Sequence, residues 1–136
     1  KALIIAREAG LELELSDVRI DSVFPPDFDS SGSVQEFLER LPRADSWFAE
    51  RIQALSASGK VLRFAASIDG SKGTARVGPV EALLADPLAA IRGGENAFVF
   101  TTKYYSPIPL VIRGYGAGAD VTASGVFADI LRTITW

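Results

Sequence analysis

The fold of this chain is decided by residues 110–123, which read LVIRGYGAGADVTA. The apolar run over 110–113 predicts a short buried strand, and residues 121–132 have the spacing of a helix. Between them glycine occupies every second position, at Gly114, Gly116 and Gly118. Such a loop brings bare backbone close to a ligand, and the following helix N-terminus offers N–H groups to a phosphate or a carboxamide oxygen. The residues alone fit a tight structural turn and a ligand-contacting loop equally well.

The glycine pattern departs from the dinucleotide-binding fingerprint Gly-x-Gly-x-x-Gly, because the third glycine arrives one residue early. The acidic residue that the fingerprint expects about 20 positions later, after another strand, has no place before Trp136. Asp120, at the start of the predicted helix, would compete with a bound anion or would serve as an N-cap or first-turn acid. The loop by itself is therefore not a complete dinucleotide-binding motif.

The rest of the chain interleaves helical and strand-like patterns. Ser33 and Glu36 form a Ser-x-x-Glu capping box, Pro42 ends or kinks the helix that follows, and Gly59 stops the next one. Helices are predicted over residues 1–10, 34–41 and 45–58, and strands over 11–15, 18–23, 60–68, 74–77, 80–84, 97–102 and 110–113. This irregular order predicts an α+β fold, a mixed sheet covered by helices.

Two other patterns have a structural explanation. The third predicted helix carries a stripe of Trp47, Phe48, Ile52 and Leu55, which favours core packing over a ligand-binding aromatic box. Residues 70–73 combine two glycines with a lysine, but they lack the order of a phosphate loop and no helix follows them. They are therefore predicted to form a hairpin turn.

Composition excludes several classes of function. The 136 residues carry 14 basic and 17 acidic side chains, a net charge of -3, which argues against nucleic acid as the main partner. No apolar run approaches the length of a membrane span. The chain has no cysteine and no histidine, so Ser-His-Asp catalysis and cysteine-based zinc sites are excluded and no metal site is predicted.

Several long stretches, residues 1–10, 59–63, 95–100, 104–118 and 120–129, resemble the C-terminal part of homoserine dehydrogenase. The sequence of these stretches is most similar to the bifunctional aspartokinase–homoserine dehydrogenases of bacteria and plants. The resemblance implies a reversible, NAD(P)-dependent interconversion of L-aspartate 4-semialdehyde and L-homoserine, on the route to threonine, isoleucine and methionine. The implied partners are this substrate pair and a second copy, in a homodimer formed through the sheet, with no nucleic acid and no membrane.

The same resemblance implies the domain plan. Residues 1–113 would be the catalytic and dimerisation region, truncated at its N-terminus, and residues 114–136 the glycine-rich loop and a helix that returns to the nucleotide-binding domain. That Rossmann domain would lie upstream of Lys1 and is missing here. The isolated fragment is accordingly expected to be inactive. The full-length enzyme is expected in the cytoplasm, or in the plastid if the source is a plant.

Residue roles also follow from the resemblance. The family signature ends in an Asp-x-x-x-Lys helix turn whose lysine falls on Lys1, and a lysine near the substrate oxygen can transfer the proton that accompanies hydride transfer. Gly118 matches the family's cofactor-contacting glycine, with Gly116 and Ala117 beside it, and the cofactor would be NADP or NAD. No residue is implied to bind a metal.

Two alternatives remain at this point. One is a non-catalytic dimerisation or assembly module derived from the same fold. The other is an unrelated enzyme that uses the acid pairs Asp27 and Asp29 or Glu12 and Glu14. The second is disfavoured, because in a strand that alternates with leucine the two glutamates lie on the solvated face.

Overall fold

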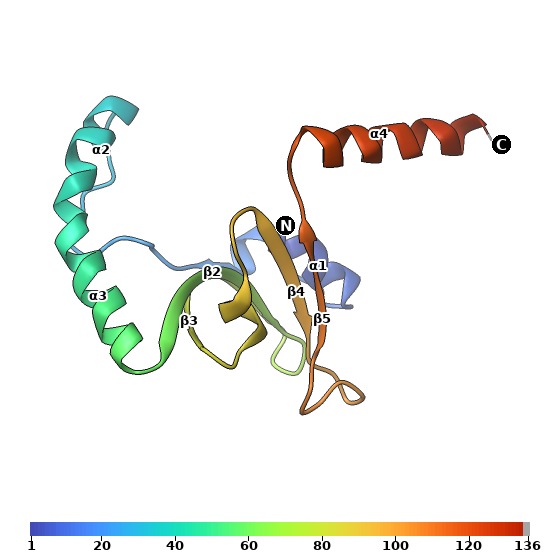
Figure 1. Cartoon of the computed structure of the whole chain (residues 1–136), viewed down its shortest axis with the longest axis horizontal. Helices are drawn as coiled ribbons and strands as arrows, with labels where there is room; N and C mark the ends of the chain where they lie inside the picture. The colour runs from blue at the N-terminus through green and yellow to red at the C-terminus, as the bar shows by residue number, and fades with distance from the viewer. Residues whose placement is uncertain (135–136) are drawn as a thin grey trace. The chain divides into compact units, whose positions relative to one another are not determined.

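The computed structural model describes residues 1–134, which form two units with the division after Leu84 (Figure 1). The first unit contains α1 (Ala2–Glu8), β1 (Val18–Ile20), α2 (Val34–Arg40), α3 (Asp45–Ala57), β2 (Lys60–Asp69) and β3 (Thr74–Leu83). The second contains β4 (Glu95–Phe100), β5 (Leu110–Tyr115) and α4 (Ala119–Ile134). Short 3₁₀ turns lie at Leu15–Asp17, Leu41–Ala44 and Pro87–Ala90.

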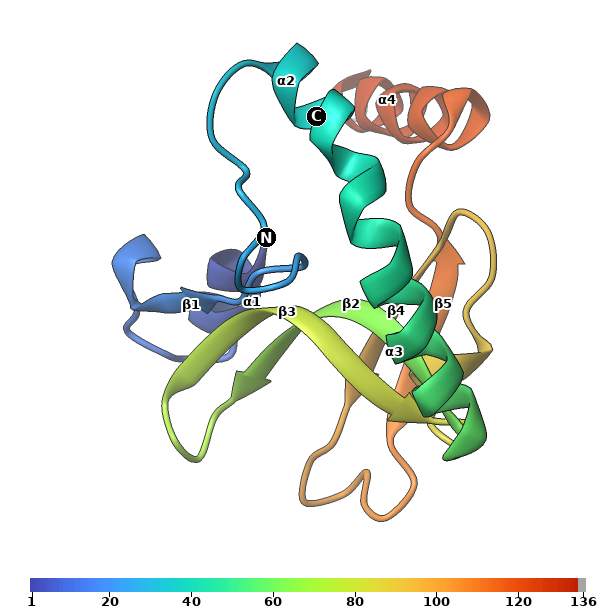
Figure 2. The ribbon, with the colours of Figure 1, turned by 90° about the vertical axis from the view of Figure 1, so that its left-hand side faces the viewer.

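The sheet of the first unit is mixed, in the order β1-β3-β2. β1 runs parallel to β3 and β2 runs antiparallel to it, from Lys60 opposite Leu83 to Asp69 opposite Thr74. Figure 2 shows the β2–β3 hairpin as two long, bent strands. Helices α1 and α3 pack against these strands. The predicted α+β class, with a mixed sheet covered by helices, is confirmed.

β3 is one unbroken strand, whereas the sequence predicted two short strands on either side of Gly78 and Pro79. The reason is the limited pairing of β1, which reaches only as far as Val77. Beyond that residue β3 has a neighbouring strand on one side only. A proline is tolerated at such an edge because the ladder there does not require its missing N–H.

The predicted strand over residues 11–15 is wrong, because the backbone there is irregular and ends in a 3₁₀ turn. Leu11 and Leu13 still face inward, against a small cluster of buried residues: Ala2, Ala6, Val18 and Ala75. Arg7 Nε donates to the Leu13 carbonyl at 2.9 Å, and the Arg7 guanidinium pairs with Glu14 at 2.8 Å. The backbone groups of Leu11 and Leu13 are therefore bonded by the Ala6 carbonyl and the Arg7 side chain, and not by a neighbouring strand.

The two helices α2 and α3 follow one another through a 3₁₀ turn that contains Pro42 (Figure 1). The predicted capping box is present, with Ser33 and Glu36 bonded reciprocally. α3 ends before Gly59, whose φ of 67° lies in the left-handed region that favours glycine. The local signals for starting and stopping these helices are confirmed.

The predicted buried stripe of α3 is correct only in part. Leu55 is 7% exposed and the two aromatic residues are half-buried, but Ile52 is 55% exposed. The aromatic rings of the helices pack instead on the loop before them: Phe24 stacks on Phe28 with centroids 4.5 Å apart and meets Phe37 edge-on at 5.6 Å. This packing ties the loop over residues 24–28 to the helices.

The second unit is an antiparallel hairpin followed by a helix. β4 and β5 pair from Glu95 opposite Tyr115 to Phe100 opposite Leu110. The strand predicted over 110–113 is confirmed as part of β5, but its predicted burial is wrong, since Ile112 is 54% exposed. Burial depends on what covers a strand, and no covering element is encoded in the strand's own pattern. None of the described helices is long and apolar enough to cross a membrane.

Candidate functional site

The glycine loop, Gly116-Ala117-Gly118, joins β5 to α4. All three residues are exposed, and Gly118 has a φ of 131°, which a residue with a side chain rarely adopts. α4 begins immediately afterwards, and its first hydrogen bond runs from Thr122 N–H to the Gly118 carbonyl at 3.0 Å. The N–H groups of the preceding three helix residues therefore have no partner within the helix.

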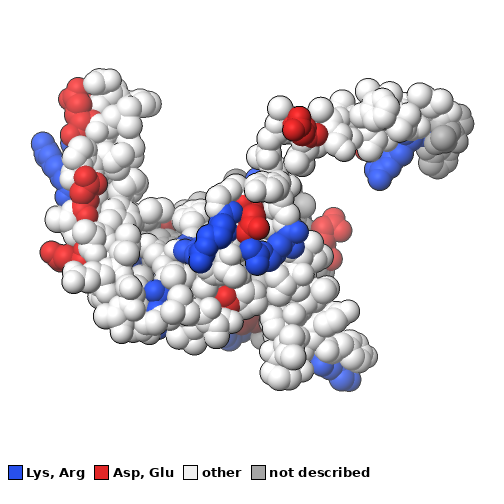
Figure 3. All heavy atoms as spheres, viewed as in Figure 1, with Lys and Arg blue, Asp and Glu red and all other residues white. Residues whose placement is uncertain are grey.

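The surroundings of this loop fit a ligand that approaches bare backbone. A Cβ built on Gly118 would meet nothing within 4 Å, so no steric clash requires glycine here. The positive φ favours glycine, and the missing side chain leaves the backbone accessible to a ligand. Asp120 lies in the first turn of α4, where a carboxylate interacts favourably with the helix dipole. In the space-filling view most of the visible surface of α4 is uncharged (Figure 3). An exposed backbone beside N–H groups that have no partner within the helix suits a hydrogen-bond acceptor such as a carbonyl oxygen.

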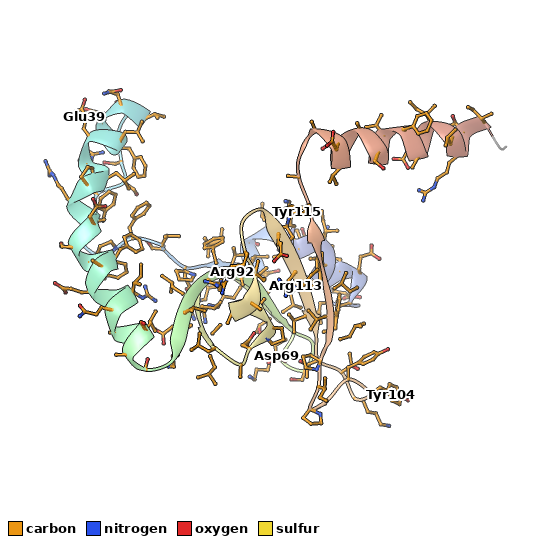
Figure 4. All side chains as sticks on the ribbon, in the orientation of Figure 1. Glu39, Asp69, Arg92, Tyr104, Arg113 and Tyr115 are labelled. Atoms are coloured by element: carbon orange, nitrogen blue, oxygen red, sulfur yellow. The ribbon has the colours of Figure 1, made fainter. Side chains whose placement is uncertain are left out.

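The strand that leads into the loop is fixed by an ion pair. Arg113 Nη2 lies 2.5 Å from Glu95 Oε2 and also donates to the Ala90 carbonyl at 3.0 Å. The Glu95 carboxylate accepts a further bond from the Arg92 N–H at 2.9 Å, and these bonds, that from Arg113 first, lower the pKa of Glu95. Figure 4 shows Arg92, Arg113 and Tyr115 around this hairpin. The position at which the loop leaves β5 is therefore well defined.

Lys1 lies in the first unit, directly before α1. Its side chain is exposed, and its carbonyl accepts the first helical bond, from Ile5 N–H at 3.2 Å. Within residues 1–134 the Lys1 ammonium makes no ion pair. The structure thus brings Gly116, Ala117 and Gly118 together in one turn and presents Lys1 as an uncommitted amine at the start of a helix.

One member of each acid pair, Asp29 and Glu14, has a structural partner. Asp29 accepts bonds from the Ser31 N–H at 2.9 Å and the Ser31 hydroxyl at 2.6 Å, which lower the pKa of Asp29. It also pairs with Arg40 at 3.6 Å, beside a pocket of about 430 Å³ that Asp27 helps to line. Glu14 pairs with Arg7. No group of three potential metal ligands occurs in the described part of the chain.

Two features of the site were missed by the sequence analysis. Glu95 and Arg113 stand 18 residues apart, and only the β4–β5 register makes them neighbours. Asn96 packs against Gly116 across the same hairpin. Neither contact could be found from the sequence, because the register of the two strands cannot be read from one sequence.

A sequence profile of the family described as homoserine dehydrogenase matches residues 1–131. The match includes Lys1 and the whole glycine loop. The chain belongs to the homoserine dehydrogenase family. The relationship gives the resemblance seen in the sequence a firm basis.

Close relatives are bifunctional enzymes. The chain is 52% identical over 134 residues, 98% of its length, to the bifunctional aspartokinase/homoserine dehydrogenase of Haemophilus influenzae. It is 40% identical over 136 residues, its entire length, to a chloroplastic bifunctional aspartokinase/homoserine dehydrogenase 2 of Zea mays. The chain spans only 16% and 15% of the length of these two relatives.

Solved structures agree on the fold. A crystal structure of a Candida auris protein of unknown function superposes with a TM-score of 0.82 and 38% identity, covering 97% of this chain and 37% of that one. A putative homoserine dehydrogenase of Archaeoglobus fulgidus superposes with a TM-score of 0.61 over 98% of this chain and 33% of its own, at 23% identity. The α+β architecture of this family region is therefore observed in other proteins.

Proposed function

We propose that the complete protein containing this chain interconverts L-aspartate 4-semialdehyde and L-homoserine with NAD(P)H. The observation that carries the proposal is the exposed glycine loop between β5 and α4, with Gly118 at a φ of 131°, in a chain that matches this dehydrogenase family. The chain supplies the nicotinamide-facing loop and an amine for proton transfer. The non-catalytic module is the opposing hypothesis, and an assay of homoserine-dependent nucleotide reduction separates the two.

The cofactor is proposed to contact Gly116, Ala117 and Gly118. The bare backbone at the two glycines allows close approach, and the unpaired N–H groups at the start of α4 are donors for a carboxamide oxygen. When bound, the nicotinamide supplies the hydride chemistry. The loop's contribution is to hold and orient the nicotinamide, whether NADP or NAD is the natural cofactor.

Lys1 is proposed to move the proton that accompanies the redox step. Reduction of the aldehyde creates an alkoxide oxygen, which accepts a proton from the Lys1 ammonium; in the reverse direction the neutral amine removes the hydroxyl proton. The match of Lys1 to the lysine of the family's Asp-x-x-x-Lys turn supports this role, and its exposed side chain is accessible to a substrate.

We further propose a homodimer formed through the sheet. On one face of the β4–β5 hairpin, cross-strand pairing brings together Phe98 with Ile112 and Phe100 with Leu110. Phe98 is 46% exposed, and apolar patches of this kind often mark interfaces. The change Ile112→Asp should shift the mass measured by light scattering from dimer to monomer, and an unchanged dimer would refute this interface.

The names of the relatives lead to two more proposals. Because both are bifunctional, an aspartokinase is proposed in the same polypeptide. The maize relative is described as chloroplastic, which supports a plastid location for a plant source and a cytoplasmic one for a bacterial source.

The proposed function is tested by assaying the complete protein for homoserine-dependent formation of NADPH or NADH. Lys1→Met should lower kcat by about 10²- to 10⁴-fold, the usual contribution of a positioned proton donor, with little change in the KM for nucleotide. Lys1→Arg is the matched control for charge, because a guanidinium keeps the positive charge but does not release its proton. We expect both variants to be impaired. Full activity of Lys1→Met, or no activity of the wild type, would contradict the proposal.

A further inference from the structure

The side chain of Asn96 lies directly against the backbone of Gly116. In the β4–β5 register Asn96 stands opposite Gly114, so its side chain is on the face that these two residues share. A Cβ built on Gly116 would lie 3.0 Å from Cγ of Asn96 and 3.6 Å from its Cβ, and closer still to Nδ2. The amide therefore occupies the space that a side chain at position 116 would need.

This contact is not explained by hydrogen bonding. Among residues 1–134 the Asn96 side chain makes no hydrogen bond, so its amide does not cap a helix or close a turn. One position earlier, the side chain of Glu95 is bonded to Arg113 and to the Arg92 N–H, which fixes the start of β4. Asn96 is thus an exposed side chain, next to a bonded residue, that packs onto the first glycine of the loop.

We propose that Asn96 is a positioning residue for the cofactor, holding the backbone of Gly116, and with it Ala117 and Gly118, in the conformation that contacts the nicotinamide nucleotide. The inference rests on the function proposed above for this loop. Gly114 provides an internal comparison on the same face, because a Cβ there meets nothing within 4 Å. Only Gly116 is held from the side, and it is the glycine at which β5 passes into the loop.

The test uses the complete protein and measures two things: the Kd for NADPH or NADH by fluorescence titration, and the steady-state constants. Asn96→Ala removes the packing group, and the Kd and KM for nucleotide should rise about five- to tenfold while the KM for homoserine stays unchanged. Gly116→Ala forces the amide aside and should weaken nucleotide binding to a similar degree. The double variant should bind more tightly than either single variant, because the new methyl group fills the space that the amide leaves.

Gly114→Ala is the matched control and should leave the Kd unchanged. The inference is overturned if Asn96→Ala binds nucleotide as the wild type does, or if the losses of the two single variants simply multiply in the double variant. It is also overturned if Asn96→Ala lowers the melting temperature and impairs nucleotide and homoserine alike, which is the signature of general unfolding. A wild type that binds no nucleotide would instead refute the proposed function.

Discussion

Replacing Gly118 by alanine tests the central feature of the site. At a φ of 131° an L-residue is strained, by about 1–3 kcal/mol for such sparsely populated conformations. There is room for the methyl group, since a Cβ at this position meets nothing within 4 Å. The cost is therefore conformational and not a clash, so the protein either keeps the loop and bears the strain or lets the loop relax to another φ.

Each outcome has a measurable size. If the loop relaxes, the N–H groups at the start of α4 no longer face the nucleotide, and a loss of about 1–3 kcal/mol corresponds to a Kd roughly 5- to 150-fold weaker. If the loop keeps its conformation, the free energy of unfolding falls by the same amount and the melting temperature decreases. Fluorescence titration with NADPH or NADH and a thermal melt on the complete protein measure both quantities.

Gly125→Ala is the control, because it adds the same methyl group in the middle of α4. A Cβ there also meets nothing within 4 Å, and alanine is favoured over glycine in a helix by up to about 1 kcal/mol. It should leave the Kd unchanged and the melting temperature equal or higher. A Gly118→Ala protein with wild-type Kd and wild-type melting temperature would refute the assignment of strain and function to this glycine.

Three further predictions concern the rest of the chain. Ser33→Ala removes the N-cap of α2 and should cost about 1 kcal/mol locally, seen as roughly fivefold faster hydrogen exchange of the α2 amides; unchanged exchange would contradict it. The pKa of Asp69 is lowered to about 2, mainly by the Ser71 hydroxyl and then by Lys72, so its stabilising effect is complete above the ordinary value of 3.8 and is lost as the pH falls through 2. NMR titration should give that midpoint, and Ser71→Ala should raise it; a wild-type midpoint near 3.8 would be evidence against these bonds. The isolated 136-residue chain should form no NADPH or NADH from homoserine, and detectable turnover would disprove this.

Sequence reasoning succeeded where the determinants are local. The Ser33 capping box, the stop at Gly59 and the hairpin turn at residues 70–73 are each specified by a few adjacent residues, and the structure contains all three. The glycine loop was found for the same reason, since glycines at alternate positions between an apolar run and a helical pattern are visible in the local sequence.

It failed where the determinants are distant. The alternation over residues 11–15 is typical of a strand, yet Arg7 binds this segment as a loop. The burial predicted for Ile112 required a covering surface that its own strand does not specify. Asn96 was not recognised because its contact with Gly116 depends on the register of two strands, and a shift of one residue would turn its side chain to the other face.

The exposure of the apolar surfaces explains why catalysis should require more than the residues of this chain. Among residues 1–134 no large side chain is fully buried, and six of the eight buried hydrophobic residues are alanines, which contribute little to burial. Large apolar side chains remain exposed on the β4–β5 hairpin, which precedes the glycine loop, and on α4, which follows it. Covering these apolar side chains with other protein would stabilise the elements that carry the loop. Saturating nucleotide should therefore not give the isolated chain activity. Part of the binding free energy would go into ordering the loop and would not contribute to orienting the nicotinamide.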